Sequence, residues 1–423
     1  MELKKGYKLT EVGVVPEYWD VEKLGDLRIL MTNGFVGTVK TQYTDSDEGI
    51  IYIQGYNVEE NSFNYNGIKK VTQEFHRQHI KSSLKEGDLL TIQTGDVGLT
   101  TIVPKELEGA NCHALIITRL KKSKCYSKYF SFYLNSKQGR QRLKEIETGT
   151  TMKHVNVGEM LHFYVPVPPL DEQKTIANAL SDADALISSL EKLIAKKRSI
   201  KQGAMQKLLQ PKEGWLIKKF EDVMDGFSSG QTPYRGIKEY YTGNIPWITS
   251  GELNYNIITD TIEKITEDAV RKTNLKIIPS GTLLMAITGL EAAGTRGSCA
   301  ITGIPATTNQ SCMALYPKKG KLITKYLFYY YVLHGNKFAF EYCQGTKQQS
   351  YTGRIVRKLP ITLPPIIDEQ IRIAEILSDM DAEITALEAK LEKYKRIKQG
   401  MMQNLLTGKI RLIKKEEPHV LPA

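Results

Sequence analysis

The stretch DEQKTIANALSDADALISSLEKLIAKKRSIKQGAMQKLL, Asp171 to Leu209, occurs twice in this chain of 423 residues. The second copy is DEQIRIAEILSDMDAEITALEAKLEKYKRIKQGMMQNLL, Asp368 to Leu406. About 22 of the 39 positions are identical without a gap, which is more than two unrelated amphipathic helices share. The chain therefore contains an internal duplication.

Each copy has the apolar pattern of a coiled-coil helix. Apolar residues alternate at spacings of four and three, which places them on one seam of a helix. The predicted seam residues are Ile176, Leu180, Ala183, Ile187, Leu190 and Ile194, and then Ile373, Leu377, Met380, Ile384, Leu387 and Leu391. The first half of each copy is acidic and the second half is basic, so antiparallel pairing sets opposite charges together along the seam. We predict one intramolecular antiparallel coiled coil; the alternative is a dimer interface.

The duplication extends into the flanking sequence. EGDLLTIQTGDVG, Glu86 to Gly98, corresponds to PSGTLLMAITGLEAAG, Pro279 to Gly294, and both are typical of a strand followed by a glycine-containing loop. Short strand-like runs with a helix or two between them predict an α+β fold, with two β-rich globular domains in a tandem pseudo-repeat and two long helices. The predicted segments are a first globular domain (1–165), a first spacer helix (166–212), a second globular domain (213–362), a second spacer helix (363–408) and a C-terminal tail (409–423).

Composition and charge indicate the class of partner. Lys and Arg number 58 against 47 Asp and Glu, and the formal net charge of +11 favours a polyanion such as a nucleic acid. There is no apolar run of about 18 residues and no signal peptide at the start of the sequence, so we expect a cytoplasmic protein without a membrane partner. The five cysteines have no C-x-x-C spacing, so the sequence indicates neither a zinc site nor a redox disulfide.

Motifs for catalysis are missing from the sequence. It has no phosphate-binding G-x-x-x-x-G-K-[ST] loop, no dinucleotide-binding G-x-G-x-x-G and no base-methylating Asn/Asp-Pro-Pro-Tyr/Phe stretch. His76 and His79 in EFHRQHI have no third ligand suggested nearby, so ordinary histidines are favoured over a metal site. We predict a protein that binds rather than catalyses, and one that holds no metal.

A tandem motif resembles a known family. The order G-T-[TK], P-[VI]-x-x-P-P-[LI] and D-E-Q-x-x-I-A is similar to that in the specificity subunit of type I restriction-modification enzymes. It occurs here as Gly149, Thr150, Pro166, Pro169 and Asp171 to Ala177, and again near Gly345, Thr346, Pro360, Pro365 and Asp368 to Ala374. The resemblance covers essentially the whole chain.

The resemblance implies a subunit that recognises DNA and has no cofactor of its own. Each globular domain would be a target-recognition domain reading one half of a bipartite sequence in double-stranded DNA. The helices would fix the gap between the halves and bind two methyltransferase subunits. Those partners would carry S-adenosylmethionine, and restriction and translocase subunits, with ATP and magnesium, would join the larger complex.

Candidate DNA contacts lie in equivalent loops of the two domains, where Lys and Arg suit phosphates and Asn, Gln, Arg, Thr or Ser suit base edges. The candidates are Gln54, Asn57, Thr94, Asp96, Thr150, Lys153 and His154 in the first domain, and Thr249, Ser250, Asn254, Thr288, Arg296, Thr346, Lys347, Gln348, Tyr351 and Arg354 in the second. Two alternative functions stay open, a stand-alone DNA-binding regulator and an enzyme. A second helix stripe of Ala179, Leu186, Leu193 and Ile376, set off from the seam, favours a protein partner over the regulator.

Overall fold

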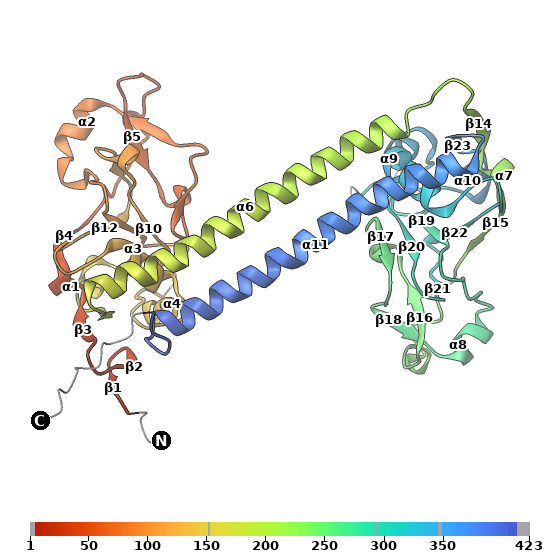
Figure 1. The fold of residues 1–423 in the computed structure, drawn as a ribbon. Helices are drawn as coiled ribbons and strands as arrows, with labels where there is room; N and C mark the ends of the chain where they lie inside the picture. Colours follow the sequence, from red (N-terminus) through yellow and green to blue (C-terminus); the bar gives the residue numbers. More distant parts are fainter. Residues whose placement is uncertain (1–4, 151–152, 293, 346–348, 413–423) are drawn as a thin grey trace, which may run out of the picture. The chain divides into compact units, whose positions relative to one another are not determined.

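The computed structural model describes residues 5–150, 153–292, 294–345 and 349–412. The chain forms two compact units, one of Met1–Glu191 with Ala389–Ala423 (unit 1) and one of Lys192–Glu388 (unit 2). Each unit contains one globular domain together with part of helix α6 (Leu170–Leu208) and part of helix α11 (Ile367–Leu405) (Figure 1). The two helices are therefore shared between the units.

The globular domain of unit 1 has a four-stranded sheet in the order β10-β9-β12-β4, a three-stranded sheet β11-β5-β8 and a pair β13-β3. Two hairpins, β1-β2 and β6-β7, complete it. The strands are β1 (Tyr7–Thr10), β2 (Gly13–Pro16), β3 (Asp20–Lys23), β4 (Arg28–Asn33), β5 (Ile50–Ile53), β6 (Val58–Glu59), β7 (Ser62–Phe63), β8 (Lys69–Val71), β9 (Leu89–Ile92), β10 (Thr100–Ile102), β11 (Asn111–Cys112), β12 (Leu115–Leu120) and β13 (Tyr164–Val167). The helices are α1 (Leu24–Leu27), α2 (Gln73–Gln78), α3 (Ser127–Asn135), α4 (Lys137–Glu145) and α5 (Val157–Leu161).

Unit 2 repeats this topology. Its sheets are β15-β22-β19-β20-β17, β18-β16-β21 and β14-β23, in which every strand except β17 has a counterpart in unit 1. The strands are β14 (Leu216–Lys219), β15 (Met224–Ser229), β16 (Ile245–Ile248), β17 (Asn256–Ile258), β18 (Glu263–Ile265), β19 (Leu283–Ala286), β20 (Cys299–Thr302), β21 (Thr307–Thr308), β22 (Cys312–Pro317) and β23 (Pro360–Leu363). The helices are α7 (Phe220–Val223), α8 (Glu267–Lys272), α9 (Thr324–Tyr342) and α10 (Gly353–Lys358).

The local sequence explains why equivalent elements form at equivalent places. The central strands β9 (LLTI) and β19 (LLMA) are continuous apolar runs and are buried along their whole length, as expected for strands covered on both faces. Helices α2 and α8 begin after Thr72 and Thr266, whose hydroxyls each accept a backbone N–H bond of 3.2 Å from the third helical residue. The apolar strand sequences and the threonine caps are thus duplicated in the two globular domains, as the long helices are.

One buried glutamine fixes each long helix to its globular domain. The side chain of Gln173 is fully buried, donates to the carbonyls of Lys124 (2.9 Å) and Pro168 (2.8 Å), and accepts from the backbone N–H of Tyr126 (2.8 Å). Buried amides need such partners because an unpaired polar group is costly away from water. The glutamine of the repeated DEQ motif therefore has a structural role.

Gln370 makes the same three bonds in unit 2. It donates to the carbonyls of Lys321 (3.0 Å) and Pro364 (3.1 Å) and accepts from the N–H of Ile323 (3.2 Å). Gln370 is also fully buried. The connection between helix and domain is thus the same in both units.

The helix pairing is antiparallel in each unit. In unit 1, Lys395 of α11 pairs with Glu191 of α6 at 3.1 Å, and in unit 2, Lys197 of α6 pairs with Glu383 of α11 at 2.6 Å. Antiparallel pairing therefore sets basic residues of one helix against acidic residues of the other, and the predicted fold class is confirmed. All the predicted seam residues are buried or half-buried, from Leu180 and Leu377, both fully buried, to the half-buried Ala183, Ile187, Met380, Leu387 and Leu391.

Candidate nucleic-acid interface

Two loops are joined by backbone hydrogen bonds at the same place in each globular domain. In unit 1, Thr94, which follows β9, forms an isolated bridge with His154, and His154 forms a second bridge with Thr148. In unit 2, Thr288 bridges to Ser350 and Ser350 bridges to Gln344. We use the name paired loops for the loops that contain Thr94, Thr148 and His154 in unit 1, and Thr288, Gln344 and Ser350 in unit 2.

The backbone bonds within the paired loops are nearly identical in the two units. Thr148 and His154 exchange two N–H···O bonds of 2.9 and 3.0 Å, and Gln344 and Ser350 exchange two of 3.0 and 2.9 Å. Because the bonds use main-chain atoms, they impose no requirement on the side chains. The arrangement presents different side chains on one backbone geometry.

The structure brings five candidates of the first domain together at its paired loops. Thr94, Asp96, Thr150 and Lys153 are exposed, and His154 is half-buried. The ammonium of Lys153 lies 3.9 Å from the carboxylate of Glu147, with 68% of its side chain exposed. An exposed lysine with so long an ion pair remains available to a phosphate.

The other two candidates of the first domain lie in the turn after β5. Asn57 is fully buried: its Oδ1 accepts from the N–H of Gln54 (3.0 Å) and its Nδ2 donates to the carbonyl of Asn64 (2.9 Å). The assignment of Asn57 to base contact is therefore corrected to a structural role. The half-buried Gln54 donates to the hydroxyl of Tyr56 (3.1 Å), and Tyr56, half exposed, was missed by the sequence reasoning although an aromatic residue in a polar loop is a recognisable signal.

The corresponding turn of unit 2 supports this correction. Glu252 accepts from the N–H of Thr249 (2.8 Å), as Asn57 does from Gln54, and it is likewise buried. The hydroxyl of Thr249 also donates to Glu252 (2.9 Å), so this threonine is engaged within the turn. Ser250 is half-buried and Asn254 is exposed, which leaves Asn254 as the accessible polar side chain of the predicted three.

The paired loops of unit 2 separate the remaining candidates into accessible and structural residues. Arg354 is exposed in the first turn of α10, and Thr288 is half-buried beside Ser350. Tyr351 is buried in the core, where burial raises the pKa of its phenol and keeps it neutral, so its assignment to DNA contact is corrected. Thr346, Lys347 and Gln348 lie outside the described residues.

Arg296 stabilises the loop after β19. Its guanidinium donates to the carbonyls of Leu290 (3.0 Å) and Glu291 (2.7 Å) and lies 4.2 Å from the ring centroid of Phe340, which is 65% exposed. Two of its donor positions are thus used within the loop. A cation above an exposed aromatic ring also forms a flat surface suited to a nucleotide base.

Neither a metal centre nor a membrane span is found in the described parts of the chain. No group of three or more His, Cys, Asp or Glu there is arranged to hold a metal ion. His76 instead hydrogen-bonds Asn111, a buried residue beside β5. No helix among the same residues is long and apolar enough to cross a membrane.

Two α+β domains with the same paired loops, each joined to a long helix by the same buried glutamine, define a protein built from one repeated unit of domain and helix. A family model described as the type I restriction modification DNA specificity domain matches residues 16–202 and again 212–399. These two matches cover most of the chain, so the chain belongs to this family. The resemblance stated from the tandem motif is confirmed.

Relatives match along almost the entire length. A putative type I restriction enzyme specificity subunit, MjaX of Methanocaldococcus jannaschii, is 25% identical over an alignment 442 residues long, which covers 97% of this chain and 97% of that one. The solved S subunit of a type I restriction-modification system from M. genitalium has a TM-score of 0.59 at 14% identity, covering 96% of this chain and 98% of that one. An HsdS subunit from Thermoanaerobacter tengcongensis has a TM-score of 0.51 at 17% identity, covering 94% and 98%. These structural likenesses show the fold, and the family membership shows that the chain is a specificity subunit that recognises DNA without catalysis of its own.

Proposed function

We propose that each globular domain reads one half of a bipartite double-stranded DNA target through its paired loops and the turn after β5 or β16. The observation that carries this proposal is the repetition of one backbone arrangement, Thr94 with His154 and Thr288 with Ser350, under different side chains. Different side chains on one backbone offer different donors and acceptors to the base edges, and this suits the reading of two different half-sites. The net charge of +11 suits the phosphate contacts that such binding needs.

The test is a map of adenine methylation across the host genome with and without this gene. The expected result is that one gapped motif loses methylation when the gene is deleted. Exchanging the globular domain of unit 1 for that of a relative should then change one half of the motif and leave the other half intact. Unaltered methylation at every motif while the protein is expressed would contradict the proposal.

Individual contacts are separable by their salt dependence. Replacing Lys153 by Ala removes one phosphate contact, so affinity should fall about equally for all sequences and the slope of log affinity against log salt should become shallower by about 1. Replacing Thr94 by Ala should instead alter the preference at one base position by about 1 to 3 kcal/mol. Lys122 is exposed just beyond β12, at the opposite end of β9 from Thr94, and is the control for Lys153.

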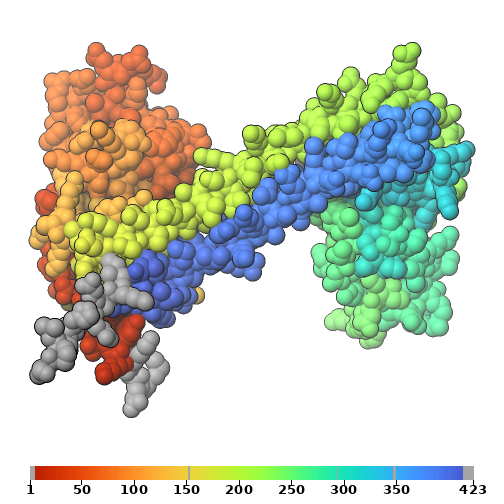
Figure 2. Space-filling model, in the orientation of Figure 1, coloured from red at the N-terminus to blue at the C-terminus, as the bar shows by residue number. Residues whose placement is uncertain are grey.

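We also propose that the outer sides of α6 and α11 dock two methyltransferase subunits, one for each half-site. Exposed apolar side chains support this: Leu186 and Leu193 on α6 are 37% and 38% exposed, and Ile376 on α11 is 43% exposed. Figure 2 shows that atoms of both helices lie at the surface. The fourth predicted stripe residue, Ala179, packs instead against the core of unit 1. Apolar side chains on a solvent-facing helix are typical of a protein interface.

The docking proposal has a direct test. Leu193→Glu should weaken co-purification with a type I methyltransferase subunit of the same host, whereas Ser188→Glu, another exposed position of α6, should not. S-adenosylmethionine would bind the methyltransferase subunits, and ATP and magnesium the restriction and translocase subunits of the larger complex, in the cytoplasm where the DNA lies. Equal co-purification of both variants would contradict the docking surface.

A further inference from the structure

A lysine of unit 2 connects both long helices to the globular domain. Lys201 of α6 forms an ion pair with Asp381 of α11, and its ammonium lies 5.6 Å from the ring centroid of Tyr329 on α9. The hydroxyl of Tyr329 donates to the other carboxylate oxygen of Asp381 at 2.8 Å. We call this arrangement of lysine, aspartate and aromatic ring the lysine clamp.

Unit 1 contains the same clamp at the equivalent positions. Lys398 of α11 pairs with Asp184 of α6 at 2.6 Å, and its ammonium lies 5.9 Å from the ring centroid of Phe132 on α3. Phe132 has no hydroxyl, and here Glu60, between β6 and β7, supplies a second carboxylate at 3.3 Å from Lys398. Each clamp is therefore connected to its globular domain twice. In unit 2 the connections are the ring of Tyr329 and its hydroxyl, and in unit 1 they are the ring of Phe132 and the carboxylate of Glu60.

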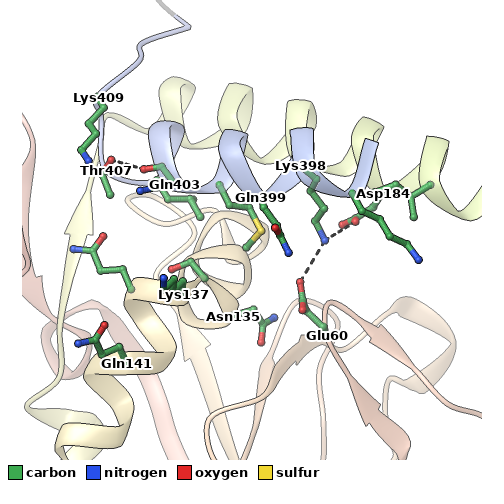
Figure 3. Close-up of a pocket in the computed structure, with 16 residues that line it drawn as sticks. Glu60, Asn135, Lys137, Gln141, Asp184, Lys398, Gln399, Gln403, Thr407 and Lys409 are labelled. Atoms are coloured by element: carbon green, nitrogen blue, oxygen red, sulfur yellow. Dashed lines mark hydrogen bonds and ion pairs between the residues drawn. The ribbon is translucent and has the colours of Figure 1, made fainter. Parts of the chain in front are cut away.

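The contact between Lys398 and Glu60 crosses an open space. A cavity of about 840 Å³ lies between α4 and α11, lined among others by Asn135, Gln141 and Gln403. Figure 3 shows Lys398 extending from α11 to Glu60 on the globular domain and to Asp184 on α6. This ion pair therefore links the β6-β7 hairpin to α11 beside the cavity.

Both lysines are held in partly desolvated positions. Only 21% of the Lys201 side chain and 15% of the Lys398 side chain are exposed. Burial opposes the charge of Lys398, but the hydrogen bond with Asp184 and the charge of Glu60 outweigh it and raise the pKa of the ammonium above its usual value. Partly buried ion pairs contribute little net stability compared with apolar residues, and their best attested role is to specify one geometry over others.

We propose that Lys201 and Lys398 are positioning residues that fix how each DNA-reading domain is held on its helix pair, and thereby restrict the spacing of half-sites that the protein accepts. This inference rests on the proposed reading of a bipartite target. It assigns a role in spacing to side chains that need not contact DNA. The duplicated clamp supports it, because all three positions of the clamp recur in both units.

The test measures affinity of the complex with methyltransferase for duplexes that carry the mapped motif with its natural gap, and with the gap one base pair shorter or longer. Lys398→Met and Lys201→Met should each reduce the preference for the natural gap by about fivefold, the range of coupling between directly contacting groups. Lys395→Met is the matched control, because Lys395 pairs with Glu191 on the same helices and is 42% exposed. The control should keep the preference of the unaltered protein.

Two milder variants keep the test informative if a methionine variant fails to fold. Glu60→Gln removes only the link from the unit 1 domain, and Tyr329→Phe removes only the hydroxyl bond in unit 2. A reduced gap preference with unchanged half-site sequence preference supports the inference. Equal weakening at every gap, or no change in any clamp variant, overturns it. If the unaltered complex shows no preference for the motif over random DNA, the proposed function fails instead.

Discussion

Replacing Gln173 by Leu should destabilise unit 1 far more than the similar volumes of the two side chains suggest. Leucine fills a similar volume but leaves two carbonyls, of Lys124 and Pro168, and the N–H of Tyr126 without partners. The site is fully buried, so water does not replace the amide. At about 1 to 1.5 kcal/mol for each of the three bonds lost in this way, the free energy of unfolding should fall by about 3 to 4.5 kcal/mol. That is a large share of the stability of a typical domain.

Hydrogen exchange measured by mass spectrometry gives a local assay for this substitution. The N–H of Tyr126 is donated to Gln173, so peptides covering Cys125 to Asn135 should exchange faster in the variant, while peptides of unit 2 should exchange as before. Urea unfolding gives the total change. Gln202→Leu, at an exposed position of α6, is the control and should change stability by less than about 0.5 kcal/mol.

The reasoning has a second test in the other unit. Gln370→Leu should affect unit 2 in the same direction, and by somewhat less because its three bonds are longer. If Gln173→Leu lowers the free energy of unfolding by less than about 1 kcal/mol, or no more than the exposed control, then the buried amide does not fix the helix to its domain.

Three further substitutions test the fold and its pH dependence. Gly230→Ala would place a methyl group against the backbone oxygen of Thr308, so unit 2 should lose about 3 kcal/mol in urea unfolding, and unchanged stability would contradict this packing. Thr352→Ala removes the cap of α10 and should cost about 1 kcal/mol, which Thr352→Ser should restore; a serine variant as unstable as the alanine variant would argue against the cap. Burial lowers the pKa of His113, which contacts Tyr52 at 3.1 Å, so the unfolded state binds the proton more readily and stability should be lost as the pH falls below about 6.5. His113→Asn should make this loss shallower, and identical pH profiles by calorimetry would refute the assignment.

The helices were predictable from the sequence because their determinants are local. The seam follows from spacing, and the antiparallel direction follows from the sign of charge along each copy, as the pair Lys197 and Glu383 shows. Base-contact residues were harder to choose, because exposure of a loop side chain depends on contacts distant in sequence. Asn57 and Tyr351 are polar residues in predicted loops, yet both turn inward.

A signal for Asn57 was nevertheless present in the sequence. Gln54 and Asn57 have the same spacing as Thr249 and Glu252, which is the spacing of a helix cap and its third residue. A comparison of these two turns would have indicated that Asn57, like Glu252, hydrogen-bonds within its own turn. The clamp lysine was visible as well, since Lys201 and Lys398 occupy equivalent positions where the apolar seam ends.

The two units together indicate how such a protein changes its target without losing its fold. The groups that fix geometry, Gln173 with Gln370 and Lys201 with Lys398, are identical in the two copies. The paired loops are joined through main-chain atoms, so a residue such as His154 is exchangeable without loss of these bonds. Side chains at the paired loops are therefore free to vary while the helix, the clamp and the loop backbone keep their places. Substitution at the loops should then alter sequence preference with little change in stability, whereas substitution at the glutamine should do the reverse.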